Sequence, residues 1–223
     1  MVRANARKAP PATPALGSEA RSQSPVRAGR IFRALGLLCL LAAFVVGGYM
    51  WWLLWGTGIG TAREQHHLRQ EIDKLINNPR PFDPGSGRPA APIREGAPVG
   101  VLEIPRMHLD IVVVNGTSTA DLRRGPGHYM DSAYPWEDTG RVAIAGHRTT
   151  YLHPFWSLDK LKPGDLIRFR TQYGTFDYHV TGSRVILPSG VWVLKQTKEP
   201  SLVLTTCNPR FSASHRLVVF ASR

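Results

Sequence analysis

Cysteine is scarce in this sequence: the 223 residues include only Cys39 and Cys207. Cys39 lies in a long apolar run, whereas Cys207 follows a strand-like pattern near the C-terminus. A thiol in lipid and a thiol in a folded domain cannot form a disulfide, so a disulfide-stapled scaffold is excluded. Cys207 is then a lone thiol in the folded part of the chain, and chemical reactivity is a leading reason to keep one.

Acidic residues are also few, with 16 Asp and Glu against 28 Lys and Arg, which gives a formal net charge of +12. Residues 1–33 supply half of that excess, because they hold seven basic residues and one acid, Glu19. The rest is spread over the remaining chain without a long basic run. This pattern favours a solvated basic surface over a nucleic-acid interface, so we expect no nucleic-acid partner.

Several nucleotide and metal motifs are missing. The sequence contains no G-x-G-x-x-G pattern, no Walker-type phosphate loop and no C-x-x-C pair. Its histidines in the folded part, among them His108, His128 and His179, lack metal-ligand spacing to one another. Nucleotide binding and a structural zinc site therefore lose their usual support, and we expect no cofactor.

One long apolar run, Ala34–Trp55, carries no charge over 22 residues. A membrane-spanning helix needs about 20 such residues, and Trp51, Trp52 and Trp55 gather at its far end as an interfacial belt would. A cleaved signal peptide is the alternative, but its apolar region is usually about 7–15 residues. We therefore predict an uncleaved single-pass anchor. Because basic residues precede it, the N-terminus should be cytoplasmic and the C-terminal part outside the cell.

Composition divides the chain into four parts. Residues 1–33 form a basic tail that we expect to be disordered, and residues 34–56 form the anchor. Residues 57–97 combine a short helix, expected over Thr61–Asn77, with a Pro- and Gly-rich linker. We expect residues 98–223 to form the folded domain.

The folded part has the pattern of a mainly β domain. Short apolar and alternating runs bounded by Gly, Pro and Asn predict strands, and the helical stretches, around Thr119–Leu122 and Ser157–Leu161, are short. Many short strands with few helices predict a closed or nearly closed barrel. The predicted strands are Val99–Ile104, Leu109–Val114, Val142–Ala145, Asp165–Thr171, Thr175–Val185, Leu202–Thr206 and His215–Ala221.

Three chemically useful side chains fall at the ends of predicted strands: His147, Cys207 and Arg216. A thiolate is a nucleophile, an imidazole can take and return its proton, and a guanidinium can donate hydrogen bonds to an oxyanion. Taken one at a time, Cys207 could equally fill an apolar gap and Arg216 could be a surface charge. Spacing alone does not show that the three meet.

The residues around these three positions resemble the sortase family. Val203-Leu204-Thr205-Thr206-Cys207 is similar to the T-L-x-T-C signature around the sortase nucleophile. Ala143 to Arg148 resembles the strand and the catalytic histidine, and Arg216 matches the family's arginine. The segment from Leu204 to Phe211 is most similar to class E sortases, the housekeeping type of high-GC Gram-positive bacteria, although Asn208 stands where a His is common.

The resemblance implies an eight-stranded sortase-type barrel, preceded here by one transmembrane helix, and a two-step transpeptidation. Cys207 would attack the Thr–Gly carbonyl of an LPxTG- or LAxTG-like C-terminal sorting signal on a secreted protein. An amine, usually of a peptidoglycan precursor, would then accept the acyl group. Tyr129, Thr206 and Arg210 are weaker candidates for substrate binding. The calcium site of class A sortases is not recognisable, so we expect no metal.

Other functions fit the sequence less well. An L,D-transpeptidase would require a Ser-x-Gly-Cys-x-Arg type motif, which is absent. A papain-like endopeptidase usually places its cysteine before its histidine, and here His147 comes first. A wall-binding module without activity would have no need of an intact Cys, His and Arg set.

Overall fold

The computed structural model describes residues 25–52, 56–79, 82–83, 88–89 and 92–223. The chain divides into two units, one up to Val46 and one from Gly47 onward, which are treated separately below. The N-terminal tail up to residue 24 and Trp55, the end of the expected apolar run, lie outside the described residues. Residues 80–81, 84–87 and 90–91 of the proline-rich linker lie outside them too.

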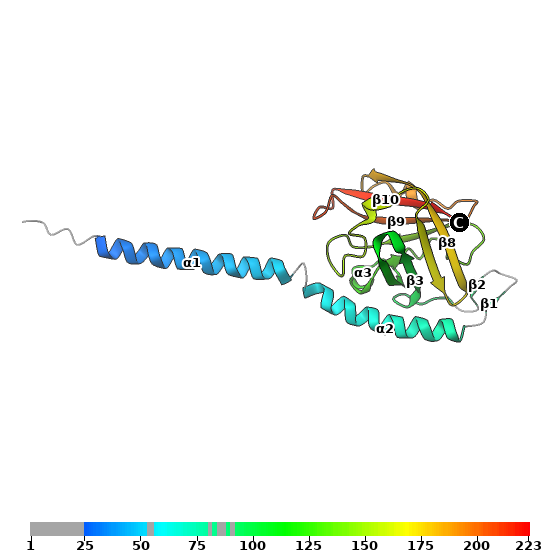
Figure 1. Cartoon of the computed structure of the whole chain (residues 1–223), viewed down its shortest axis with the longest axis horizontal. Coiled ribbons are helices and arrows are strands. Elements are labelled where there is room, and N and C mark those ends of the chain that lie inside the picture. Colours follow the sequence, from blue (N-terminus) through cyan, green and yellow to red (C-terminus); the bar gives the residue numbers. More distant parts are fainter. Residues whose placement is uncertain (1–24, 53–55, 80–81, 84–87, 90–91) are drawn as a thin grey trace, which may run out of the picture. The chain divides into compact units, whose positions relative to one another are not determined.

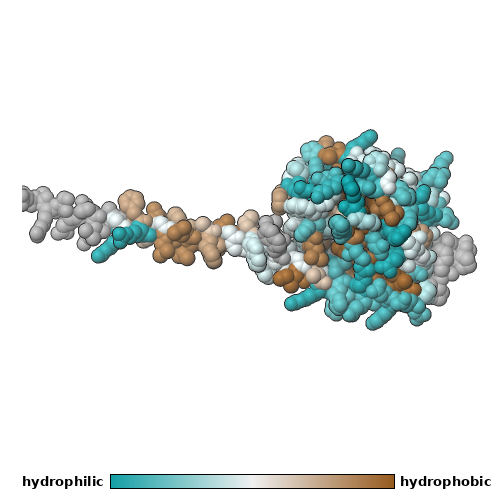
Figure 2. All heavy atoms as spheres, viewed as in Figure 1, coloured by the Kyte–Doolittle hydropathy of each residue, from teal (hydrophilic) through white to brown (hydrophobic). Residues whose placement is uncertain are grey.

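Helix α1 covers Pro25–Trp51. Proline suits the first position of a helix, where its missing N–H has no partner to lose. The helix therefore begins ahead of Ala34, so residues 25–33 of the expected disordered tail are helical. Within the described residues, Gly29–Trp51 is the single helix long and apolar enough to cross a membrane, and its apolar side chains are exposed along its length (Figure 2).

Eight strands close into a barrel in the second unit (Figure 1). Their order around the barrel is β10-β8-β7-β3-β4-β5-β6-β9. Two neighbouring pairs, β4 with β5 and β6 with β9, are parallel, and the other pairs are antiparallel. The strands are β3 (Pro98–Ile104), β4 (Leu109–Asn115), β5 (Gly127–His128), β6 (Arg141–Ala145), β7 (Leu166–Thr171), β8 (Gly174–Ile186), β9 (Ser201–Asn208) and β10 (His215–Ser222).

The predicted strands agree with these bounds to within one or two residues, and the eight-stranded barrel is confirmed. The strand that sequence patterns did not predict is β5, which has two residues and so shows no alternation. Two further short strands, β1 (Phe82–Asp83) and β2 (Arg88–Pro89), pair with each other in the linker region. The short helical pieces α3 (Thr119–Arg124) and η3 (Leu158–Lys160) lie where the sequence placed them.

The barrel interior is the main hydrophobic core. Side chains alternate between the two faces of a strand, so every second residue enters this core. In β9 these residues are Leu202 and Leu204, and in β6 they are Val142 and Ile144. The loop residue Phe155 packs into the same core and is fully buried.

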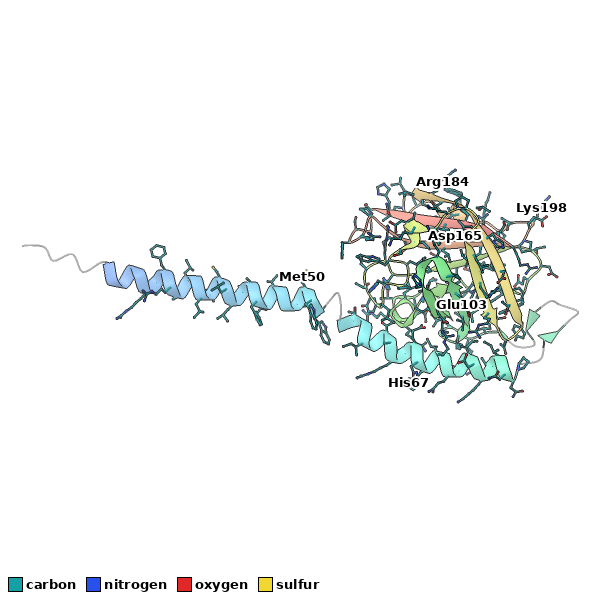
Figure 3. The ribbon with its side chains drawn as sticks, in the orientation of Figure 1. Met50, His67, Glu103, Asp165, Arg184 and Lys198 are labelled. Atoms are coloured by element: carbon teal, nitrogen blue, oxygen red, sulfur yellow. The ribbon has the colours of Figure 1, made fainter. Side chains whose placement is uncertain are left out.

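Two smaller apolar clusters lie outside the barrel. One is covered by α2 (Thr57–Asn77), whose Leu68 and Ile72 pack on the outer faces of β3 and β4. The opposite side of α2 is polar, and His67 projects there, away from the barrel (Figure 3). The other cluster lies over β6, β9 and β10, where Val193 of the short helix η4 (Val191–Leu194) covers Ala143, Val203 and Val218.

A buried polar network surrounds His128 of β5. Its Nδ1 lies 3.1 Å from Oδ1 of Asn115, and its Nε2 lies 2.9 Å from the carbonyl oxygen of Ala133. The Tyr134 ring stacks on the imidazole, with centroids 4.5 Å apart. Burial lowers the pKa of His128 to about 4, and this effect outweighs the hydrogen bond to Ala133, which acts in the opposite direction.

This lowered pKa predicts acid sensitivity. As pH falls from about 6.5 toward 4, His128 becomes protonated in the unfolded chain but stays neutral in the folded chain. The free energy of unfolding therefore falls in that window. The loss is on the order of 3 kcal/mol if the full shift is expressed. His128→Gln should flatten the pH dependence of the unfolding free energy between pH 6.5 and 4, measured by urea titration. His67→Gln, on the exposed face of α2, is the matched control, and equal slopes in all three proteins would contradict this account.

Candidate active site

Cys207 and Arg216 face each other across two neighbouring strands. β9 and β10 are antiparallel, and their register pairs Cys207 directly with Arg216. Side chains of directly paired residues project to the same face of a sheet. The fold therefore brings the thiol and the guanidinium together, although nine positions separate them in the sequence.

His147 reaches the same region from the other side of β9. β6 runs parallel to β9, and its last residue, Ala145, pairs with Thr205. The pairing continues past the strand end, because the backbone N–H of Gly146 donates to the carbonyl oxygen of Thr205 at 3.0 Å. His147 follows directly, beyond the end of β6 and beside the C-terminal end of β9.

Cys207 and Arg216 lie on the outer face of the barrel. Leu204 of β9 points into the core and Val203 points outward, so alternation also turns Cys207 outward. Alternation from Val218, in the outer cluster, likewise turns Arg216 outward. Ala143 is in the same outer cluster, and His147 follows two residues after the end of β6. The strands thus present a nucleophile and a guanidinium on one face, with an imidazole at the adjacent strand end.

Gly146 allows the chain to turn closely over the core before His147. A Cβ at this position would lie 2.6 Å from the ring of Phe155, which is fully buried. The backbone N–H of Phe155 in turn donates to the carbonyl oxygen of His147 at 3.1 Å. The hydroxyl of Thr206 donates to the carbonyl oxygen of Gly146 at 2.7 Å. The backbone at His147 is therefore fixed on two sides, by Phe155 at its own carbonyl oxygen and by Thr206 at the carbonyl oxygen of Gly146.

The imidazole of His147 is half-buried beside an aromatic ring. The ring of Tyr151 lies with its centroid 4.8 Å from that of His147. Burial lowers the pKa of His147 below its ordinary value, and the positive charge of Arg123 lowers it further. Both effects favour the neutral imidazole, which is the form that can accept a proton.

The guanidinium of Arg216 is anchored to the backbone through one nitrogen. Its Nη1 donates to the carbonyl oxygens of Ala213 and His215 at 2.9 and 3.0 Å. A guanidinium carries five N–H donors in a planar fork, so Nε and Nη2 still have hydrogens to offer. The arrangement fixes the plane of the fork and leaves donors for an incoming oxygen.

Arg148, the residue after His147, ties the two strand ends together, a role that sequence patterns did not reveal. Its side chain is only 4% exposed. Nη1 donates to Oδ1 of Asn208 at 2.5 Å and to the carbonyl oxygen of Cys207 at 3.3 Å, and Nη2 lies 3.3 Å from Oδ1 of Asp159. In the sequence, Arg148 is only the last residue of the segment that resembles the sortase strand and histidine, and no spacing signal marks its burial.

The three weaker candidates lie in different places. Tyr129 lies over the outer face, with its hydroxyl 3.5 Å from Oγ1 of Thr205. Thr206 is buried and alternates to the inner face, opposite to Cys207. Arg210 stacks over the ring of Trp156 at 4.5 Å and binds Asp159. The fold therefore brings Tyr129 to the face of Cys207. Thr206 and Arg210 instead bind residues of the loops, Gly146 in the first case and Trp156 and Asp159 in the second.

No group of three or more His, Cys, Asp or Glu side chains that could hold a metal occurs among the described residues. The residues gathered at these strand ends are those of thiol-based acyl transfer. Cys207 is half-exposed, and an imidazole and a guanidinium lie on neighbouring strands. Such a set can attack a carbonyl, stabilise the resulting oxyanion and protonate a leaving amine.

Comparison with known proteins agrees with this chemistry. The Sortase domain matches residues 102–223. Sortase D of Bacillus subtilis is 28% identical over 199 residues, covering 86% of this chain and 98% of its own length. Sortase SrtE1 of Streptomyces coelicolor is 29% identical over 221 residues, which span 91% of this chain but only 60% of that protein. The structure of a Clostridium perfringens sortase D5 transpeptidase matches 72% of this chain and 98% of that chain, with a TM-score of 0.61 and 25% identity.

Arg148 and Arg210 both form ion pairs with Asp159, and comparing them tests whether Arg148 stabilises the ends of the two strands. Arg148→Met should lower the free energy of unfolding by about 2–3 kcal/mol, because it removes charge-assisted hydrogen bonds made by a buried guanidinium. Arg210→Met removes a more exposed partner of the same Asp159 and should cost about 1 kcal/mol or less. Urea denaturation of both variants measures the difference. Equal losses of unfolding free energy in the two variants would show that Arg148 contributes no more than a residue in a surface ion pair.

Proposed function

The chain belongs to the sortase family, and on that premise we propose that Cys207, His147 and Arg216 carry out its cysteine transpeptidase reaction. One observation supports this proposal above the others: Cys207 and Arg216 are register partners on β9 and β10, and His147 follows the end of β6, the other neighbour of β9. Each residue type matches one requirement of acyl transfer from an amide to an amine.

In the first half-reaction, the proton of the Cys207 thiol passes to His147, and the Sγ attacks the carbonyl carbon of the scissile amide. Negative charge then develops on the carbonyl oxygen, and the free donors of Arg216 stabilise it. The C–N bond breaks when His147 gives a proton to the leaving amine. The products are a thioester on Cys207 and a released amine.

In the second half-reaction, an acceptor amine attacks the thioester carbonyl. His147 takes a proton from that amine, and the same oxyanion position at Arg216 is used again. Collapse of the tetrahedral intermediate expels the thiolate and forms the new amide. His147 and Cys207 are then ready for another cycle with no net change in their protons.

The depressed pKa of His147 shapes this cycle. If the reactive form pairs a thiolate with an imidazolium, a lower pKa of His147 makes that form a minority at neutral pH. The same shift makes His147 a ready acceptor for the proton of the incoming amine. Charged and neutral imidazole are both needed within one turnover, and burial sets the balance between them.

We further propose that the substrate is a C-terminal sorting signal of the LPxTG or LAxTG kind on a secreted protein, cut between Thr and Gly. The acceptor is an amine of the cell wall, such as that of a peptidoglycan precursor. The segment from Leu204 to Phe211 supports a class E assignment. Comparable identity to Sortase D and to Sortase SrtE1 means that peptide selectivity must decide the class.

The membrane topology is a related proposal. The apolar helix near the N-terminus supports a single-pass anchor, and the basic residues ahead of it support a cytoplasmic N-terminus with the barrel outside. This arrangement would place the site with its wall substrates. A reporter fused after Arg223 should then be active only outside the cytoplasm, and cytoplasmic activity would overturn it.

The proposed function is tested with the full-length chain in detergent, a set of LPxTG and LAxTG peptides, and an amine acceptor. Cys207→Ala should abolish cleavage and transfer. Arg216→Lys keeps the charge but loses the fork, so kcat/KM should fall on the order of 100–1,000-fold, as when one oxyanion donor is removed. Arg210→Lys is the matched control, because Arg210 holds Trp156 and Asp159, and it should lose far less. Turnover of Arg216→Lys near that of the wild type would remove Arg216 from the site.

A further inference from the structure

The N-terminal turns of α2, the helix that follows the anchor segment, contact the loop after His147. The backbone N–H of Tyr151 lies 3.5 Å from Oγ1 of Thr57, the first residue of α2. One residue further along each segment, a Cβ built at Gly58 would lie 3.5 Å from Cδ2 of Leu152. The beginning of α2 thus lies against the residues that immediately follow the proposed acid–base histidine.

A second contact leads from α2 to the same imidazole through α3. The hydroxyl of Thr61, which is buried, donates to the carbonyl oxygen of Arg123 at 2.8 Å. The guanidinium carbon of Arg123 lies 6.0 Å from the ring centroid of Tyr151, within range of a cation–π contact. The ring of Tyr151 lies 4.8 Å from that of His147. Two paths from α2 therefore meet at Tyr151.

α2 is itself firmly held where it makes these contacts. The amide of Gln65 accepts from the backbone N–H of Val112 and donates to the carbonyl oxygens of Val112 and Arg124. One turn later, Leu68 and Ile72 are buried against β3 and β4. The helix is thus a fixed edge against which the loop after His147 can rest.

The loop itself needs such support. Tyr151, Leu152 and His153 have φ angles of +51°, +63° and +40°. Three successive non-glycine residues in the left-handed region are unfavourable, at a cost of roughly 1–3 kcal/mol each, and persist only where the surroundings impose them. Contacts with Thr57 and Gly58 fall on this stretch, so α2 is well placed to impose it.

We propose that the first two turns of α2 are a positioning element for His147. Thr57 holds the backbone of Tyr151, Thr61 holds the backbone of Arg123, whose guanidinium lies against the Tyr151 ring, and that ring packs beside the imidazole. This inference rests on the proposed role of His147 as the acid–base residue. Tyr151 is then a positioning residue rather than a catalytic one. The segment between the anchor and the barrel becomes part of what makes the site competent.

The proposal has a consequence for the titration of His147. The ring of Tyr151 on its own loop lies beside it, and the charge of Arg123 from α3 acts on it. Cys207 lies on the adjacent strand β9, and Arg216 lies one strand further, on β10. Removing the Tyr151 ring exposes the imidazole to water and frees Arg123 from its contact. The imidazole should then be easier to protonate, and one limb of the pH profile should move to higher pH.

The experiment uses the full-length chain in detergent with Cys39→Ser, so that Cys207 is its only thiol. The pH dependence of peptide transfer is measured for Tyr151→Ala, Tyr151→Phe and Thr57→Val. Tyr151→Ala should lower kcat by about 10-fold or more with little change in KM, since misplacement of a catalytic group by about 1 Å can cost 100-fold. The limb of the pH profile that reports His147 should shift to higher pH in Tyr151→Ala. Tyr151→Phe keeps the ring and should have kcat and a pH limb close to those of the wild type. Thr57→Val should change kcat and the pH limb in the same direction as Tyr151→Ala, but by less.

Ile167→Val controls for a loss of stability, because Ile167 is buried in the barrel core on β7, which pairs with β3 and β8 and not with the strands that carry the site. It should lower the melting temperature while leaving the pH profile in place. If Tyr151→Ala and Thr57→Val keep the wild-type kcat and profile while His147→Ala is inactive, the positioning role is overturned and the proposed function stands. If His147→Ala retains transfer, the acid–base assignment fails and this proposal fails with it.

Discussion

The parallel pairing of β6 with β9, next to the antiparallel pairing of β9 with β10, is the constraint on which the site depends. Backbone hydrogen bonds set the register, and alternation then decides which side chains face outward together. A slip of one residue in β9 would turn Cys207 into the barrel and bring Thr206 to the outer face. The chemistry is therefore secured by the whole ladder rather than by contacts among the reactive groups.

The core explains why that register is hard to change. Leu202 and Leu204 are buried inside the barrel, while Val203 is buried on the outside beneath Val193. Apolar packing on both faces of β9 means that a slip of one residue would move Leu202 and Leu204 out of the barrel core and put the smaller Val203 in their place. Arg148 adds a local tie where the ladder ends, by joining Asn208 and the Cys207 carbonyl to Asp159. The paired strands β6 and β9 thus position His147 and Cys207 at their adjacent ends.

Strong local patterns made much of this fold predictable. Alternating runs such as Leu202–Thr206 predicted their strands closely, and the residues around His147, Cys207 and Arg216 predicted the family. Other features depend on contacts that a pattern does not encode. β5 is too short to alternate, and the spacing of Leu68 and Ile72 predicted a helix without showing that it packs on β3 and β4. Arg148 is a charged residue whose burial follows from partners that are distant in sequence.

His147 and Cys207 are proposed to act as a protonation-coupled pair at the adjacent ends of β6 and β9. The most direct test is the rate at which an irreversible thiol reagent alkylates Cys207, measured across pH in the Cys39→Ser chain with and without His147→Ala. A coupled pair titrates as a unit, so loss of the imidazole should change the shape and position of the profile. Identical profiles in the two proteins would contradict the claim.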